Sequence, residues 1–265
     1  MSTQEALPYV VLAPGILQPT DVTLENPYGS YAPVVEQFRA IGLSALLIYP
    51  DWADINDPSY PVQEHWQNLI DKAVRGLIDA GHDVVLAGHS TGALEITRYA
   101  GENRDLLQRG SHIKAIMPFS PAPYSGDVLE LLKHFYREGS VYPTDWVLIP
   151  EHQRAAFAEP LYRPIHTQHV PMHITVGLHE RPFNHLQGWI LALGGSNRTF
   201  GTMDCGHALT LEPAYQEAMP RIIMSAIKGT LLDERGGPPP LLRLDFGTRT
   251  TLAADGWALP YDQAR

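Results

Sequence analysis

The sequence predicts an α/β protein built on a mostly parallel, doubly wound sheet, with a helical cap inserted over the strand ends. Short, continuously apolar runs alternate with amphipathic stretches, as expected for parallel strands that helices cover on both faces. One long stretch, residues 124–168, interrupts this alternation. With 265 residues, 44% of them apolar and 18% charged, the chain is long enough to bury a large core.

The predicted strands are apolar runs bounded by glycine, proline or polar residues. The first run ends at Pro14-Gly15, and the third ends directly at Gly88. The runs lie at residues 9–13, 45–49, 84–87, 113–117, 172–176 and 199–203. The first run, residues 9–13, is continuously apolar, which indicates burial on both faces of a sheet.

The predicted helices carry apolar residues at helical spacing. The clearest pattern covers residues 62–80, where Trp66, Ile70 and Val74 share one stripe and Gly81 follows as a stop signal. The other predicted helices lie at residues 31–40, 91–100, 185–193 and 213–228. Strands that alternate with helices in this way predict a parallel sheet with helices on both faces.

Two stretches fall outside the alternation. Residues 124–168 are too long for a plain crossover and carry helical patterns at 128–136 and 151–158, so we interpret them as a cap within the core domain, residues 1–235. Residues 236–265 begin with Gly-Gly-Pro-Pro-Pro and continue with strand-like stretches. This extension could add a sheet edge, reach a partner subunit of a homo-oligomer, or remain loose.

Charge and cysteine content limit the environment and the partners. The formal net charge is −10, with 19 basic and 29 acidic residues, and the basic residues are scattered. This distribution argues against a nucleic-acid or membrane surface and favours a small-molecule partner. The single cysteine, Cys205, excludes an internal disulfide, and the sequence has neither a signal-peptide pattern nor a long apolar span. We therefore expect a reducing, cytoplasmic setting.

The most informative motif is Gly-His-Ser-Thr-Gly at residues 88–92, which joins a predicted strand to a predicted helix. A Gly-x-Ser-x-Gly pattern at this junction is typical of a nucleophilic serine held in a strained backbone conformation. Side chains two positions from Ser90 would collide in so tight a turn, which explains Gly88 and Gly92. The alternative is an ordinary glycine-rich loop after a buried strand.

A serine nucleophile needs a base and an acid that orients the base. His207 follows the last predicted strand and is the preferred base, with His89 and His185 as alternatives. Glu180 is the only carboxylate in the loop after the strand at 172–176. Its rivals as the acid are Asp204, three residues before His207, and Asp127.

Acyl transfer also needs two donors for the developing oxyanion and a pocket for the substrate. The backbone N–H groups of Thr91, after the serine, and Ile16, after the first strand, are the candidate donors. Aromatic residues on the segments expected around the site predict an apolar pocket. These candidates are Trp52, Phe119, Tyr124, Phe135, Trp146 and Phe183.

These motifs together resemble the α/β-hydrolase superfamily over about residues 9–228. The resemblance lies in Pro14-Gly15 after the first strand, the GHSTG turn, the acid loop with Glu180, and Gly206-His207 after the last strand. It implies an α/β-hydrolase-type fold and a serine hydrolase with Ser90, His207 and Glu180 as nucleophile, base and acid. The sequence departs from the family in three ways: no antiparallel strands precede the first core strand, proline replaces the usual histidine before Gly15, and glutamate replaces the commoner aspartate.

The expected activity is cleavage of a small to medium apolar ester, thioester or lactone through an acyl-serine intermediate. No metal or organic cofactor is implied. A lyase, cyclase or acyltransferase that keeps the same three residues is the alternative. A catalytically inactive, ligand-binding relative is a third.

Overall fold

The computed structural model describes residues 7–15, 27–48, 57–123, 151–157, 169–180, 182–193, 197–207 and 213–227. Its strands are β1 (Tyr9–Ala13), β2 (Ser44–Leu47), β3 (Val84–His89), β4 (Ile113–Phe119), β5 (Met172–Gly177) and β6 (Arg198–Met203). Its α-helices are α1 (Ala32–Ala40), α2 (Val62–Asp79), α3 (Thr91–Glu102), α5 (Glu151–Phe157), α6 (Pro182–Leu193) and α7 (Pro213–Ile227), with 3-10 turns η1 (Gly29–Tyr31) and η3 (Arg104–Leu107). Every strand and helix predicted within these ranges is present, with its ends shifted by at most a few residues.

The six strands form one parallel sheet in the order β2-β1-β3-β4-β5-β6. This arrangement confirms the predicted doubly wound α/β sheet. The chain first moves outward from β1 to β2, returns across β1 to β3, and then proceeds in one direction to β6. The winding direction therefore reverses between β1 and β3. Ligands of open α/β sheets bind beyond the carboxyl ends of the strands at such a reversal.

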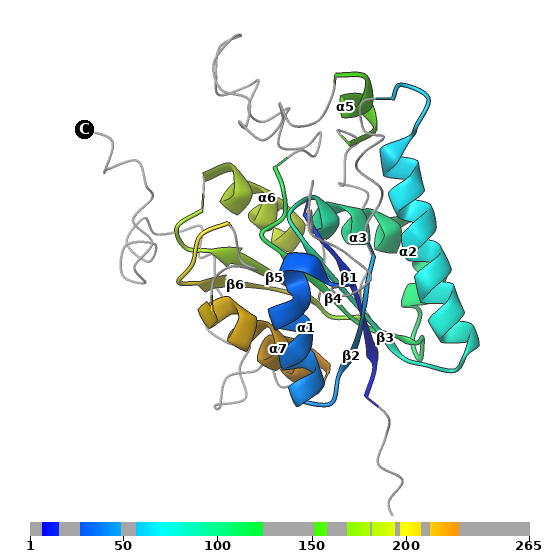
Figure 1. The fold of residues 1–265 in the computed structure, drawn as a ribbon, viewed down its shortest axis with the longest axis vertical. Coiled ribbons are helices and arrows are strands. Elements are labelled where there is room, and N and C mark those ends of the chain that lie inside the picture. Colours follow the sequence, from blue (N-terminus) through cyan, green and yellow to red (C-terminus); the bar gives the residue numbers. More distant parts are fainter. Residues whose placement is uncertain are drawn as a thin grey trace, which may run out of the picture.

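Helices cover both faces of the sheet, α1 and α7 on one side and α2, α3 and α6 on the other (Figure 1). Alternate residues of a strand face opposite sides, so Val10 and Leu12 pack toward α1 and α7, while Val11 and Ala13 pack toward α2 and α3. All four side chains are completely buried. The predicted burial of this strand on both faces is confirmed.

The α2 stripe also packs as predicted. Val62, Trp66, Ile70 and Val74 are completely buried against the sheet. Gly81 has a φ of +82° just beyond the helix, a conformation that glycine adopts without the penalty of a Cβ atom. In contrast, the edge strand β2 pairs with β1 alone: Ala45 and Leu47 pack against the core cluster that includes α1, while Ser44 and Leu46 are exposed.

One part of the predicted cap lies within the described residues. Helix α5 matches the helical pattern predicted at 151–158, and the Gln153 side-chain amide donates to the Tyr60 carbonyl at 2.6 Å, next to the start of α2. The other predicted cap helix, residues 128–136, and the extension 236–265 lie outside the described residues. None of the described helices is both long and apolar enough to cross a membrane.

Burial of His173 predicts acid sensitivity of the fold. This β5 side chain is 7% exposed, and burial lowers its pKa from 6.5 to about 4. Between these two pH values the histidine is protonated in the unfolded chain and neutral in the folded chain. The free energy of unfolding therefore falls as pH drops from about 6.5 toward 4. From pH 7.5 to 5 this one group should cost about 2 kcal/mol of unfolding free energy.

The measurement is urea unfolding of wild type and His173→Leu at both pH values. The variant should lose about 2 kcal/mol less than wild type over this interval. His169→Leu, at an exposed histidine just before β5, is the matched control and should follow wild type. Equal losses in wild type and His173→Leu would contradict the prediction.

Candidate active site

The turn between β3 and α3 holds Ser90 in an unusual backbone conformation. Its φ of 55° and ψ of −118° lie where non-glycine residues are strained, as the sequence motif predicted. Neighbouring backbone groups hold it there: the Ser90 N–H donates to the Phe119 carbonyl at 3.0 Å, and its carbonyl accepts from the Ala122 N–H at 3.0 Å. The turn is therefore fixed by the end of β4 as well as by its own strand and helix.

The two glycines of the motif permit close backbone approach. A Cβ atom on Gly92 would lie 2.3 Å from the carbonyl oxygens of both Ala13 and Pro14, and one on Gly88 would lie 2.5 Å from the Gly92 carbonyl oxygen. Both distances are far below ordinary van der Waals contact. Glycine at these positions lets α3 begin directly against the end of β1, so Ser90 lies at the reversal of the winding direction.

His207 lies beside the serine. Its Nε2 is 3.0 Å from Ser90 Oγ, although 117 residues separate the two along the chain. The histidine follows β6, and its loop runs close to the end of β5: a Cβ on Gly177 would lie 2.5 Å from the Cys205 carbonyl oxygen and 2.7 Å from that of Gly206. A third close glycine contact thus holds the histidine loop against the acid loop.

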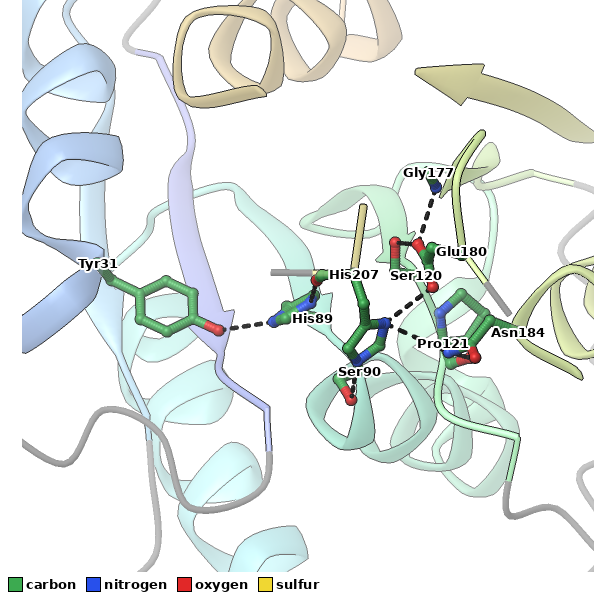
Figure 2. Close-up of polar contacts among 9 residues, drawn as sticks. All are labelled: Tyr31, His89, Ser90, Ser120, Pro121, Gly177, Glu180, Asn184 and His207. Carbon is green, nitrogen blue, oxygen red and sulfur yellow. Dashed lines mark hydrogen bonds and ion pairs between the residues drawn. The ribbon is translucent and has the colours of Figure 1, made fainter. Parts of the chain in front are cut away.

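Glu180 orients the imidazole from the opposite side (Figure 2). Its Oε2 lies 2.8 Å from His207 Nδ1, while its Oε1 accepts from the Gly177 N–H at 2.8 Å and from the Ser120 hydroxyl. A carboxylate accepts hydrogen bonds, so Nδ1 carries the proton and Nε2 is free to accept the hydroxyl proton of Ser90. The Glu180 side chain is 0% exposed, whereas 37% of the His207 side chain faces solvent.

The residues considered as alternatives have other partners. Asp204 hydrogen-bonds His179 at 2.7 Å, and both side chains are exposed. His185 interacts with the backbone of Leu178, and burial lowers its pKa. His89 is buried, and desolvation together with repulsion from His207 lowers its pKa to about 3. Asp127 lies outside the described residues.

The predicted oxyanion donors are described in part. Thr91 is the first residue of α3, so its backbone N–H has no acceptor within the helix. Ile16 lies outside the described residues, but its neighbour Gly15 is held by a hydrogen bond from the Gly15 N–H to the Tyr31 hydroxyl at 3.1 Å.

Among the predicted substrate contacts, Phe119 has a described side chain. Phe119 is completely buried in the core cluster that includes Met117 and Cys205, so we assign it a packing role in place of the expected contact with substrate. Phe183 belongs to α6, but its side chain lies outside the described part. The remaining candidates, Trp52, Tyr124, Phe135 and Trp146, also lie outside it.

Two residues near His207 were not predicted from the sequence. Ser120, directly after β4, has a φ of 45° and binds Glu180; its place after a buried strand was the only available signal. Asn184, on α6, places Nδ2 3.3 Å from His207 Nδ1 and 3.4 Å from the Pro121 carbonyl. No sequence pattern singled it out. The described residues contain no group of three or more His, Cys, Asp or Glu side chains that could hold a metal ion.

The sequence matches no protein-family model and no curated protein sequence. The fold matches solved structures. Est1E from Butyrivibrio proteoclasticus, determined with ferulic acid bound, is 17% identical with a TM-score of 0.58 over 85% of this chain and 92% of Est1E. The enol-lactonase from Burkholderia xenovorans LB400 is 16% identical, with a TM-score of 0.54 over 83% of this chain and 91% of that enzyme.

A third structure is an α/β-hydrolase enzyme from the metagenome of sediments of the Mar Chica lagoon, Morocco. It is 12% identical, with a TM-score of 0.56 over 84% of this chain and 91% of that chain. The chain therefore has the α/β-hydrolase fold, which confirms the fold expected from the sequence motifs.

The close approach at Gly92 yields a stability prediction. Gly92→Ala should lower the free energy of unfolding by at least about 2 kcal/mol, because its Cβ meets the backbone of Ala13 and Pro14 and not a movable side chain. Gly76→Ala on α2 is the matched control: its Cβ meets nothing within 4 Å, and it should stabilise by about 0.5–1 kcal/mol. Urea unfolding measures both. A Gly92→Ala protein as stable as wild type would contradict the steric argument.

Proposed function

We propose that this protein is a serine hydrolase that cleaves a small to medium apolar ester, thioester or lactone through an acyl-serine intermediate. The observation that carries the proposal is the continuous hydrogen-bonded series from Glu180 through His207 to the strained Ser90. Nucleophile, base and orienting acid in this order are the requirements of acyl transfer by serine.

In the acylation step, Ser90 Oγ attacks the substrate carbonyl carbon while its proton passes to His207 Nε2, 3.0 Å away. The imidazolium that forms is stabilised by Glu180 through the 2.8 Å contact at Nδ1. The tetrahedral intermediate then collapses. Its carbonyl re-forms, the bond to the leaving oxygen or sulfur breaks, and the leaving group takes the proton from Nε2.

In the deacylation step, a water molecule donates its proton to His207 and attacks the acyl-serine. Collapse of the second intermediate releases the carboxylic acid and returns the proton to Ser90. In each step negative charge develops on the carbonyl oxygen. The backbone N–H of Thr91 supports this charge from the start of α3, and Ile16 is proposed as the second donor.

The proposed substrate class rests on two considerations. The GHSTG serine and its base suit any activated acyl carbonyl, and proteins of the same fold include one determined with ferulic acid and an enol-lactonase. The aromatic residues proposed for the pocket favour an apolar acyl or leaving group over a charged one.

Labelling by a fluorophosphonate probe tests the proposed nucleophile. Wild type should gain one adduct on Ser90, detected by intact mass and peptide mapping. Ser90→Ala should gain none, and His207→Ala should react roughly 1,000-fold or more slowly, because no base removes the serine proton. A folded wild-type protein that stays unlabelled would contradict the proposal.

The identity of the acid can be tested with two matched variants. Glu180→Gln should lower kcat for p-nitrophenyl butyrate by roughly 1,000- to 10,000-fold. The His207 imidazolium loses its counter-charge, and the carboxylate that keeps the proton on Nδ1 is removed. Asp204→Asn removes an exposed carboxylate that binds His179, so its kcat should stay near wild type. The reverse order of effects would transfer the role of acid to Asp204.

Solvent-oxygen labelling separates hydrolysis from transfer, elimination or cyclisation. With an ester substrate in H₂¹⁸O, the acid product should carry one ¹⁸O atom from the deacylating water, as read by mass spectrometry. Single turnover with preformed acyl-enzyme supplies the control for chemical exchange. An acid product without ¹⁸O would overturn the hydrolytic proposal.

A further inference from the structure

We propose that Tyr31 and His89 are positioning residues for the reaction at Ser90, because together they join the loop after β1 to the loop that carries His207. The inference rests on the proposed function. The hydrogen bonds of His89 go to the Tyr31 hydroxyl and to the main chain of His207, not to the three reacting side chains. Neither Tyr31 nor His89 was expected from the sequence to have this role.

Three hydrogen bonds form the connection, and Figure 2 shows those that join Tyr31, His89 and His207. The Gly15 N–H donates to the Tyr31 hydroxyl at 3.1 Å, the hydroxyl lies 3.0 Å from His89 Nδ1, and His89 Nε2 lies 2.8 Å from the His207 carbonyl oxygen. The imidazole rings of His89 and His207 also lie close, with centroids 5.1 Å apart. The His89 ring thus contacts both the main-chain carbonyl and the ring of His207.

The chemistry of the partners gives each proton in this series a single place. The His207 carbonyl only accepts, so His89 Nε2 carries its hydrogen and Nδ1 is left as an acceptor. The Tyr31 hydroxyl must then donate to Nδ1, and its oxygen accepts from Gly15. Burial lowers the pKa of His89 to about 3 and raises that of Tyr31, so both side chains stay neutral near neutral pH.

The burial of these groups makes the connection costly to break. Tyr31 is 0% exposed and His89 is 2% exposed, so a donor or acceptor left without its partner could not turn to water. Apolar side chains could fill the same space without the cost of burying polar groups that need hydrogen-bond partners. The polar pair instead joins two loops at the carboxyl edge of the sheet, beyond the strand hydrogen bonds that hold β1 and β6.

The two ends of the connection lie where the proposed reaction is sensitive to position. Gly15 directly precedes Ile16, the proposed second oxyanion donor, and His207 is the proposed base. Displacement of a catalytic group by about 1 Å lowers the rate of a reaction much more than it weakens the binding of a ground state. Loss of these hydrogen bonds should therefore lower kcat and leave KM nearly unchanged.

The first variant is Tyr31→Phe in the full-length chain, which removes one oxygen and keeps the ring that fills the core. With p-nitrophenyl butyrate, kcat should fall roughly 10- to 100-fold while KM changes less than about twofold. Tyr99→Phe is the matched control. Tyr99 is also buried, but its hydroxyl donates to Asp71 on α2 and not to a residue of the site, so this variant should keep wild-type kcat.

Substitutions of His89 test whether the two residues act as one unit. His89→Phe should lower kcat about as much as Tyr31→Phe, and the double variant should lose no more than the worse single variant. His89→Gln can still donate an amide N–H to the His207 carbonyl, so it should recover kcat roughly tenfold over His89→Phe. This recovery also decides the matter if Tyr31→Phe does not fold.

Each outcome decides between the two proposals. Wild-type kcat in Tyr31→Phe, losses that multiply in the double variant, or equal kcat in His89→Gln and His89→Phe would overturn the positioning role while Ser90 still reacts with a fluorophosphonate. Failure of wild type to react with that probe would remove the proposed function itself. A fall in kcat shared equally by Tyr99→Phe would reduce the effect to general loss of stability.

Discussion

The rest of the site depends on the backbone conformation of Ser90. Ser90, with φ of 55°, joins a strand to a helix in a turn so tight that the residues two positions before and after it have no room for a Cβ atom. Gly88 and Gly92 occupy these two positions. With those glycines, α3 begins in direct contact with the main chain after β1. The turn therefore brings the main chain of Ala13 and Pro14, at the end of β1, next to the start of α3. A strained backbone conformation persists only where the surrounding structure stabilises it. Here the hydrogen bonds of Ser90 with Phe119, at the end of β4, and Ala122, just after it, stabilise the turn.

The buried carboxylate of Glu180 organises the other half of the site. Both of its oxygens are engaged, one by His207 and the other by Gly177 and Ser120, so a negative charge removed from water is met by three donors. Glutamate is longer than the aspartate common in this fold. The extra methylene lets the side chain turn back to the Gly177 N–H at the end of its own strand, three residues earlier, and still reach Nδ1. Glu180 therefore contacts the Gly177 N–H at 2.8 Å and His207 Nδ1 at 2.8 Å at the same time.

The sequence predicted most of the fold and the three residues that lie together, for identifiable reasons. Apolar runs ending at glycine or proline, such as residues 9–13 before Pro14-Gly15, encode strands locally. The order serine, acid, histidine along the chain followed from the loops after the third, fifth and sixth strands. What could not be predicted depends on contacts between distant segments. Ser120 gains its role only because β4 ends beside β5, and the Tyr31 to His89 contact joins residues 58 positions apart. Phe119 was expected at the substrate because it lies on the segment that leads into the predicted cap, but it belongs to β4, and strand alternation places its ring in the core with Ala115 and Met117.

The two neighbouring histidines show how environment, rather than residue type, assigns a role. His207 has a buried carboxylate at one nitrogen and a serine hydroxyl at the other, and more than a third of its side chain faces solvent. His89 has a hydroxyl and a carbonyl as partners, and desolvation holds its pKa near 3, so it has no stable cationic form at neutral pH. A base must accept a proton during the reaction, whereas a positioning group must keep its donors and acceptors unchanged. The neutral His89 ring hydrogen-bonds the main-chain carbonyl of His207, so it gives the proposed base a support whose hydrogen bonds stay the same throughout the proposed reaction.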